Sequence, residues 1–420
     1  MNSLSYNHNA FTGNHVAPTF DHNTFTFSGD HRAEMVVANM LRRISETISN
    51  VIKPEDLTAL VLLGGYGKGE GGIVHSNGQP HPHNNFDFLL VLKNCSPDKI
   101  AKIKSTVMQH IQKSSKQLNI GIDLSVISQK KITRMPTRVM WYDMKEGHKT
   151  LLGDKQFIPS LPHTVDNIPS WDMRNLMVNR GSLLLINRIC LQSPALGCDT
   201  KKLIIKHTMK AIIGYGDALL FSLNEYHWSY KEKLRRLVAS EQVDTNFKTL
   251  YKSAMTFRFE PNYALYQETD LIAWQSQVIR QLKKIHLECE AKRLGVINLT
   301  WHQYLEAALS KLFTEDANSY REWIKKCLNL IKPHPGSLPS HYKWMSTLGV
   351  LIANETNILP ILYPFILFDI DDSSYQHFAS SFLCVDRTDS QALNSAYLKK
   401  WGNQFDEHFW SVLKKHNITL

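Results

Sequence analysis

The sequence has little that would support disulfide bonding or a membrane anchor. Its six cysteines are scattered and none belongs to a C-x-x-C pair, so neither a disulfide framework nor a zinc-ribbon spacing is present. The longest apolar run, residues 358–368, contains two prolines and falls short of the roughly 20 residues that a bilayer-spanning helix needs. Residues 1–30 lack the apolar core of a signal peptide. We expect reduced thiols, no membrane span and a cytoplasmic location, with secretion by a route without a cleaved signal left open.

The composition is that of a folded protein with a basic excess. The chain has 420 residues, of which 43% are hydrophobic and 20% are charged, and its formal net charge is +10. This length suits two or three domains, and the apolar content is sufficient for real cores. A basic surface attracts nucleotides, RNA and other anions, although an excess of this size is equally typical of an ordinary basic protein.

Hydrophobic periodicity predicts alternating helices and strands in the first third of the chain. The predicted elements are a helix over 35–51, strands over 57–63, 86–92 and 120–127, a polar loop over 75–84, and a helix that begins at Ser96 and Pro97. From about Arg134 onward the pattern is helical. Apolar stripes run through 205–223 and 271–285, and further helices are expected over 304–330 and 393–416.

These elements predict an α/β N-terminal domain with a small mixed sheet, followed by a mainly α-helical C-terminal region. We expect a flexible arm over residues 1–30, the α/β domain over 31–155, a helical domain over 156–330 and a C-terminal helical section over 331–420. The last boundary rests on a proline- and glycine-containing break at residues 331–336.

The most informative stretch is glycine-rich. Six of the nine residues 64–72 are glycine, directly after a predicted strand, and such loops cradle phosphates with main-chain N–H groups. Lys68 would add a positive charge. A P-loop is disfavoured because Lys68 is followed by Gly69 rather than Ser or Thr. A Rossmann fingerprint fits residues 67–72 formally but lacks repeated βαβ units, and a simple glycine-rich turn stays an alternative.

Acidic residues follow this loop on two predicted strands. Asn85 and Asp87 share one face of the second strand, because side chains alternate along a strand. Asp123 lies inside the third strand, among apolar residues. A carboxylate in such a position is costly unless it is paired or binds a metal. Carboxylates together with substrate phosphates are what Mg²⁺ prefers, so we expect a metal site at Asp87 and Asp123.

The loop sequence G-G-Y-G-K-G-E at residues 64–70, followed by Phe-Asp-Phe at 86–88, resembles the nucleotidyltransferase superfamily, the DNA polymerase beta-like proteins. The loop is most similar to that of the bacterial nitrogen-regulatory protein uridylyltransferases, which reads G-G-Y-G-R-G-E. The resemblance covers about residues 55–130 and implies a nucleotide-binding loop and three metal-binding, catalytic positions. The implied nucleotide-binding residues are Gly64, Gly65, Tyr66, Gly67, Lys68 and Glu70, and the implied metal-binding and catalytic residues are Asn85, Asp87 and Asp123.

The resemblance implies a transferase that depends on Mg²⁺ or Mn²⁺. It would move a nucleoside monophosphate from ATP or another NTP to an acceptor hydroxyl and release pyrophosphate. The helical domain would select the acceptor, which is a protein, an RNA or a small molecule.

One position departs from the family pattern. Asn85 stands where the first Asp of the family's D-h-D motif would be, and residues 71–86 contain no Asp or Glu that could replace it. Asn keeps a carbonyl oxygen but loses the charge. The alternative is therefore a catalytically impaired nucleotide-binding pseudoenzyme or partner-binding module.

A third hypothesis is an RNA-binding protein that uses the basic helical region. Its candidate residues form two clusters, Lys201, Lys202, Lys206 and Lys210, and Lys231, Lys233, Arg235 and Arg236.

Overall fold

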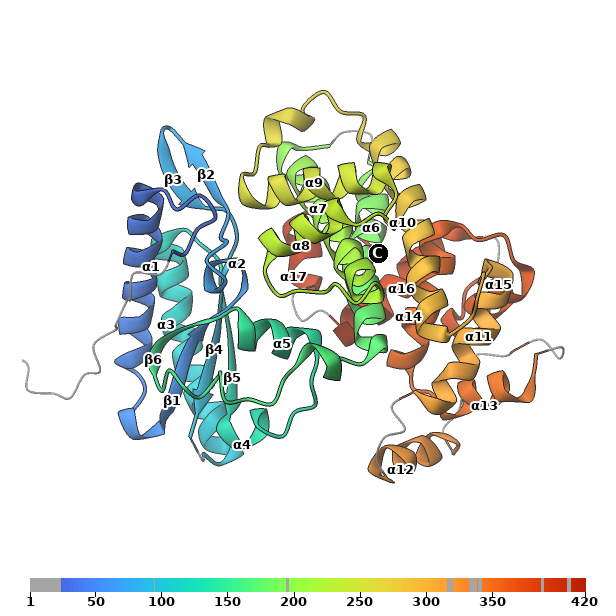
Figure 1. Ribbon diagram of the computed structural model, residues 1–420, viewed down its shortest axis with the longest axis horizontal. Coiled ribbons are helices and arrows are strands. Elements are labelled where there is room, and N and C mark those ends of the chain that lie inside the picture. The colour runs from blue at the N-terminus through green and yellow to red at the C-terminus, as the bar shows by residue number, and fades with distance from the viewer. Residues whose placement is uncertain are drawn as a thin grey trace, which may run out of the picture. The chain divides into compact units, whose positions relative to one another are not determined.

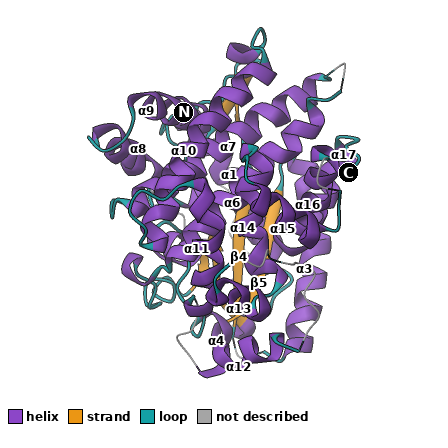
Figure 2. Cartoon of the chain, turned by 90° about the vertical axis from the view of Figure 1, so that its right-hand side faces the viewer, coloured by secondary structure: helices purple, strands orange, loops and turns teal. Residues whose placement is uncertain are grey.

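The chain divides into two compact units, residues 1–164 and 165–420. The computed structural model describes residues 24–93, 95–193, 196–315, 320–331, 338, 342–386, 389–405 and 409–420. The predicted break at 331–336 therefore lies almost entirely outside the described residues, as do residues 1–23 of the predicted arm. Helices make up most of the structure and strands a small part of it (Figure 2), and the described strands all lie between residues 57 and 153.

The first unit is built on a four-stranded mixed sheet. Its strands are β1 (Leu57–Leu62), β4 (Phe86–Leu92), β5 (Ile122–Ser128) and β6 (Lys149–Gly153), in the order β5-β4-β1-β6. The pair β4–β5 is parallel, and β1 is antiparallel to both β4 and β6. The prediction of an α/β region with a small mixed sheet is confirmed. The strand β6 is a correction, because only helices were expected after Arg134.

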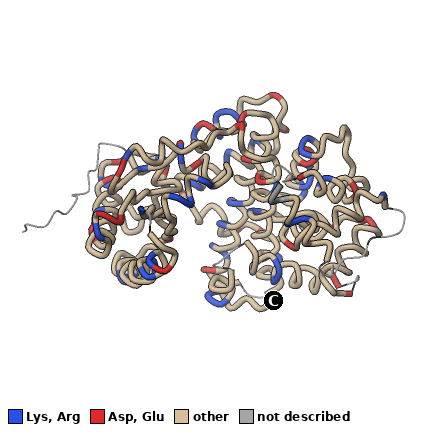
Figure 3. Tube along the Cα trace, turned by 90° about the horizontal axis from the view of Figure 1, so that it is seen from below, with Lys and Arg blue, Asp and Glu red and all other residues tan. Residues whose placement is uncertain are grey.

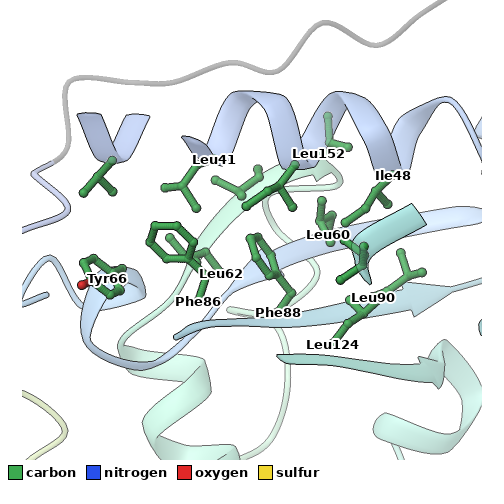
Figure 4. Close-up of a cluster of buried hydrophobic side chains, with 14 of the residues drawn as sticks. Leu41, Ile48, Leu60, Leu62, Tyr66, Phe86, Phe88, Leu90, Leu124 and Leu152 are labelled. Atoms are coloured by element: carbon green, nitrogen blue, oxygen red, sulfur yellow. The ribbon is translucent and has the colours of Figure 1, made fainter. Parts of the chain in front are cut away.

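The two faces of the sheet are covered by different helices. On one face α1 (His31–Ser49) and α3 (Pro97–Leu118) pack on a core that includes Leu60, Phe86 and Phe88 (Figures 1 and 4). On the other face α4 (Gln129–Ile132) and α5 (Val139–Glu146) pack on Ala59, Val61, Leu89 and Val91. Since side chains alternate along β4, the face of Leu89 is also the face of Asp87.

Local signals explain why these helices begin where they do. Ser96 accepts a hydrogen bond from the backbone N–H of Lys99, and Pro97 is the first helical residue of α3, as predicted. Asp30 caps α1 in the same way through the N–H of Ala33.

Two further predictions for the first unit are wrong. The expected polar loop at 75–84 is mostly a hairpin of β2 (Ile73–Ser76) and β3 (Gln79–Pro82). Its turn residues Asn77 and Gly78 both have positive φ, which is the conformation that Asn-Gly turns of type I′ require.

The second wrong prediction concerns residues 24–30, which are not part of a flexible arm. Phe25 is buried, and Glu34 accepts hydrogen bonds from the backbone N–H groups of Phe25 and Thr26 at 2.8 Å. Gly71 in turn donates its N–H to the carbonyl of Phe25, which ties this segment to the glycine-rich loop.

The second unit is helical, as predicted, and the buried residues of its two longest helices include most of the expected apolar stripes. Its helices are α6 (Ser170–Cys190), α7 (Cys198–Ser222), α8 (Tyr230–Ala239), α9 (Thr245–Phe259), α10 (Leu271–Leu294), α11 (Trp301–Thr314), α12 (Tyr320–Asn329), α13 (Trp344–Ile352), α14 (Glu355–Phe368), α15 (Ser373–Leu383), α16 (Ser390–Phe405) and α17 (Phe409–Lys415). Within the described residues, no helix combines the length and the apolar character that crossing a bilayer requires.

Charged side chains are buried in the core of this unit. Lys233 on α8 is fully buried, and its ammonium donates to Asp217 Oδ2 at 2.8 Å and to the Tyr226 hydroxyl at 3.1 Å. Tyr251 donates to the other carboxylate oxygen of Asp217. Because both ions have lost their hydration, each depends on the other for its stability in the core.

We predict that Lys233→Met lowers the free energy of unfolding by about 3–5 kcal/mol, since it leaves the Asp217 carboxylate buried without its cation. Urea denaturation of the full chain measures the change. The control is Arg235→Met on the same helix, where the side chain is 67% exposed and pairs with Glu232. We expect less than about 1 kcal/mol there, and equal losses in the two variants would contradict the prediction.

Two buried histidines predict a loss of stability in acid. Burial lowers the pKa of His286 to about 4 and that of His207 to about 3, from an ordinary value of 6.5. The unfolded chain therefore binds protons that the folded chain does not bind between pH 6.5 and 4, and the free energy of unfolding falls as the pH falls through this window.

Replacing His286 by Phe should flatten this fall by an amount on the order of 3 kcal/mol. Urea denaturation at several pH values measures the slope, with His110→Gln as a control because His110 lies exposed on α3. An unchanged slope in His286→Phe would refute the assignment.

Candidate functional site

The glycine-rich loop is a single helical turn at the end of β1. The chain leaves the strand at Leu63, whose N–H donates to the carbonyl of Asp87 at 2.8 Å. The turn α2 (Gly64–Gly67) follows at once, and the N–H of Lys68 donates to the carbonyl of Gly64. The loop is therefore hydrogen-bonded to the start of β4, the strand that carries Asp87.

Asp87 and Asp123 lie side by side at this end of the sheet. They are register partners on the parallel strands β4 and β5, so their side chains share one face, about 5 Å apart at the backbone. Both side chains are half-buried. The two acids that were expected at one site are thus neighbours in the sheet.

Asp87 also reaches the loop. Gly64 has a φ of +65°, and a Cβ at this position would overlap Asp87 Oδ2. Only glycine satisfies both conditions, because other residues strain at this φ and fill the space that the carboxylate occupies. The loop and the two carboxylates therefore form one cluster.

Asn85 joins the cluster through its side-chain amide. Its Nδ2 donates to Asp123 Oδ2 at 3.0 Å, and its Oδ1 lies where a Cβ of Gly121 would be. An Asp at position 85 would instead bring a second negative charge next to Asp123. The amide of Asn85 therefore donates a hydrogen bond to the carboxylate of Asp123 where an Asp would repel it.

Lys68 is held by a residue that the sequence analysis did not assign to the site. Its ammonium pairs with Asp143 Oδ2 of α5 at 2.7 Å, and the Lys68 side chain is only 4% exposed. Asp143 lies between the buried residues Tyr142 and Met144. An acid in such surroundings was the one signal in the sequence that could have indicated a buried cation as its partner.

Tyr66 and Glu70 are buried residues of the loop. Tyr66 points into the core beside Leu62 and Phe86 (Figure 4), and its hydroxyl donates to the carbonyl of Gly72 at 2.7 Å. Glu70 is also buried, and its N–H donates to the carbonyl of Gly65. Gly67 is buried too, and a side chain at this position would collide with the carbonyl of Leu62. Of the six predicted nucleotide-binding residues, Gly64, Gly65 and Lys68 are half-exposed, and for Lys68 the exposed part is the backbone, because its side chain is only 4% exposed.

The donor set fits a metal ion that arrives with a substrate. Among the residues that the structure describes, no three His, Cys, Asp or Glu side chains form a metal-binding group. Two carboxylates and one amide oxygen are too few for a closed protein site. Mg²⁺, however, is commonly bound by one or two carboxylates together with substrate phosphates and water. Asp87 and Asp123, with Asn85 beside them, meet that requirement.

The basic clusters of the helical unit differ from each other. On α8, Lys233 is buried in the Asp217 pair, and both Arg235 and Arg236 pair with Glu232. On α7, Lys201 and Lys202 are exposed. Basic and acidic positions are interspersed along the chain trace (Figure 3).

Comparison with known proteins adds no family assignment to this geometry. No model of a known protein family matches the sequence, and no curated protein matches it at a significant level.

Proposed function

We propose that this chain is a nucleotidyltransferase that moves a nucleoside monophosphate from an NTP to an acceptor hydroxyl. The observation that carries the proposal is the cluster at the end of β1, where Gly64 leaves space for the carboxylate of Asp87 and Asp123 lies in register beside it. A close-approach backbone next to paired carboxylates suits a triphosphate and its metal ion.

Each group has a distinct role in the proposed reaction. The backbone at Gly64 and Gly65 binds the phosphates, and Asp87 and Asp123 hold Mg²⁺ or Mn²⁺, which neutralises the phosphate charge. The acceptor oxygen forms a bond to the α-phosphorus, and the bond from this phosphorus to the bridging oxygen breaks, which releases pyrophosphate. The acceptor proton leaves to a carboxylate or to water.

Lys68 and Asp143 act in this scheme by holding the loop. Their ion pair fixes the turn α2 against α5. The loop backbone is therefore already ordered before the nucleotide binds, which lowers the entropy cost of binding. The acceptor is a protein, an RNA or a small molecule, and its selection belongs to the helical region.

A second candidate function is nucleotide binding without transfer. The observation that favours it is the hydrogen bond from Asn85 to Asp123, in which an amide stands where the family pattern has a third carboxylate. With one charge fewer than a three-carboxylate site, the cluster would bind a metal more weakly and activate a nucleophile less.

We predict that Asp87→Asn and Asp123→Asn each reduce nucleotidyl transfer by at least about 100-fold, because each removes a charged metal ligand. The assay follows α-phosphate label from each of the four NTPs, with Mg²⁺ or Mn²⁺, into the protein itself, into RNA and into cell extract. Asp98→Asn is the matched control, since Asp98 lies exposed in the first turn of α3. Label transfer that survives both site variants would refute the proposal.

Substitution of Asn85 by Asp separates the two candidate functions. An active transferase adapted to Asn85 should lose activity or keep it unchanged, whereas a degenerate site should gain metal-dependent transfer. Asn84→Asp adds the same charge one residue earlier and is the control. Nucleotide binding with no transfer in the native chain, followed by a gain in Asn85→Asp, would establish the second function.

A further inference from the structure

The helical unit contains a cavity of about 170 Å³ between α6, α7 and α10. Its wall includes charged side chains that are buried in the protein, among them Arg174 and Arg293, which are only 2% and 3% exposed. The cavity lies entirely within residues 165–420. None of its lining residues belongs to the cluster around Asp87.

The two arginines are linked through a shared carboxylate. Arg174 Nη1 lies 3.3 Å from Glu315 Oε2, and Arg293 Nη1 donates to Glu315 Oε1. Arg293 also makes two parallel bonds of 2.7 Å to Glu290, which is itself fully buried and lines the cavity. Burial alone would raise the pKa of Glu290, but Arg293 outweighs it and lowers this pKa to about 2. Glu290 is therefore ionised.

The cavity wall carries three cations. The buried arginines Arg174 and Arg293 pair with Glu290 and Glu315, whereas Lys292 is exposed and has Glu288 within its electrostatic reach. A guanidinium has five N–H groups, and the protein bonds of Arg174 and Arg293 engage only some of them. The two guanidinium groups therefore keep N–H groups that make no hydrogen bond within the protein.

The remaining wall is largely apolar. Met173 and Met177 of α6 and Ala218 and Phe221 of α7 contribute to it. A ligand that matches this wall has a short apolar body and one negatively charged oxygen group, which two arginines recognise well. The volume is below the roughly 300–1,000 Å³ of sites for drug-sized molecules, so the ligand has few heavy atoms.

We propose that this cavity binds a small oxyanion, a short-chain carboxylate or a phosphate monoester, with its head group at Arg174, Lys292 and Arg293. A buried ion network of this size contributes little net stability compared with apolar residues. A binding role explains both the unused N–H groups of the two arginines and the open volume beside them. The proposal does not depend on nucleotidyl transfer.

Calorimetric titration of the full chain with acetate, butyrate and inorganic phosphate at low ionic strength tests the proposal. We expect saturable binding, with butyrate tighter than acetate if the head group is a carboxylate, because the apolar wall covers the longer chain. Binding of phosphate without either carboxylate would support the site and assign the head group to a phosphate.

Two variants distinguish this cavity from the general surface. Lys292→Met should raise the dissociation constant about tenfold, whereas Lys284→Met, exposed two turns earlier on α10, should leave it unchanged. Ala218→Leu fills the cavity without altering a charge and should abolish binding, with its fold checked by circular dichroism. No binding by the native chain, or equal binding by native protein, Lys292→Met and a folded Ala218→Leu, would overturn the proposal and leave the network a structural one.

Discussion

The proposed active site depends on one steric fit, the carboxylate of Asp87 in the space where a side chain at position 64 would be. The main-chain bond from Leu63 to Asp87 ties the same two segments together. These contacts bring the end of β1 and the start of β4 into one cluster, and the parallel register of β4 and β5 adds Asp123. A larger residue at position 64 would separate the loop from the acids, even if every strand stayed in place.

Two sets of contacts hold the loop, one through Tyr66 and one through Lys68. On the core side the ring of Tyr66 lies 4.8 Å from that of Phe86, and its hydroxyl holds the carbonyl of Gly72. Towards α5, the buried ion pair of Lys68 and Asp143 fixes the position where the turn ends. A backbone held in this way is ordered before any ligand arrives, and this ordering reduces the entropy that binding must overcome.

Features set by neighbouring residues could be predicted from the sequence, whereas features set by distant pairs could not. The strand at 86–92 and the Ser96 cap follow from local periodicity and local hydrogen bonding, and both were predicted correctly. The hairpin at Asn77 and Gly78 carried a readable turn signal that was missed, because polar residues around it suggested a loop. The partner of Lys68 lies 75 residues away, and Glu315 lies 141 residues from Arg174. No local pattern indicates which acid such a buried cation will meet.

The parallel pairing of β4 and β5 has a consequence for the order in which the first unit is assembled. The crossover between these strands runs through α3, which packs on the face opposite to Asp87 and Asp123. The connection that makes the strands parallel therefore cannot cover the acids. Their face is covered instead by α4 and α5, which follow the last of the three strands β1, β4 and β5. During synthesis from the N-terminus, the carboxylates can be in register before Asp143 has left the ribosome, and Lys68 gains its counter-ion only afterwards.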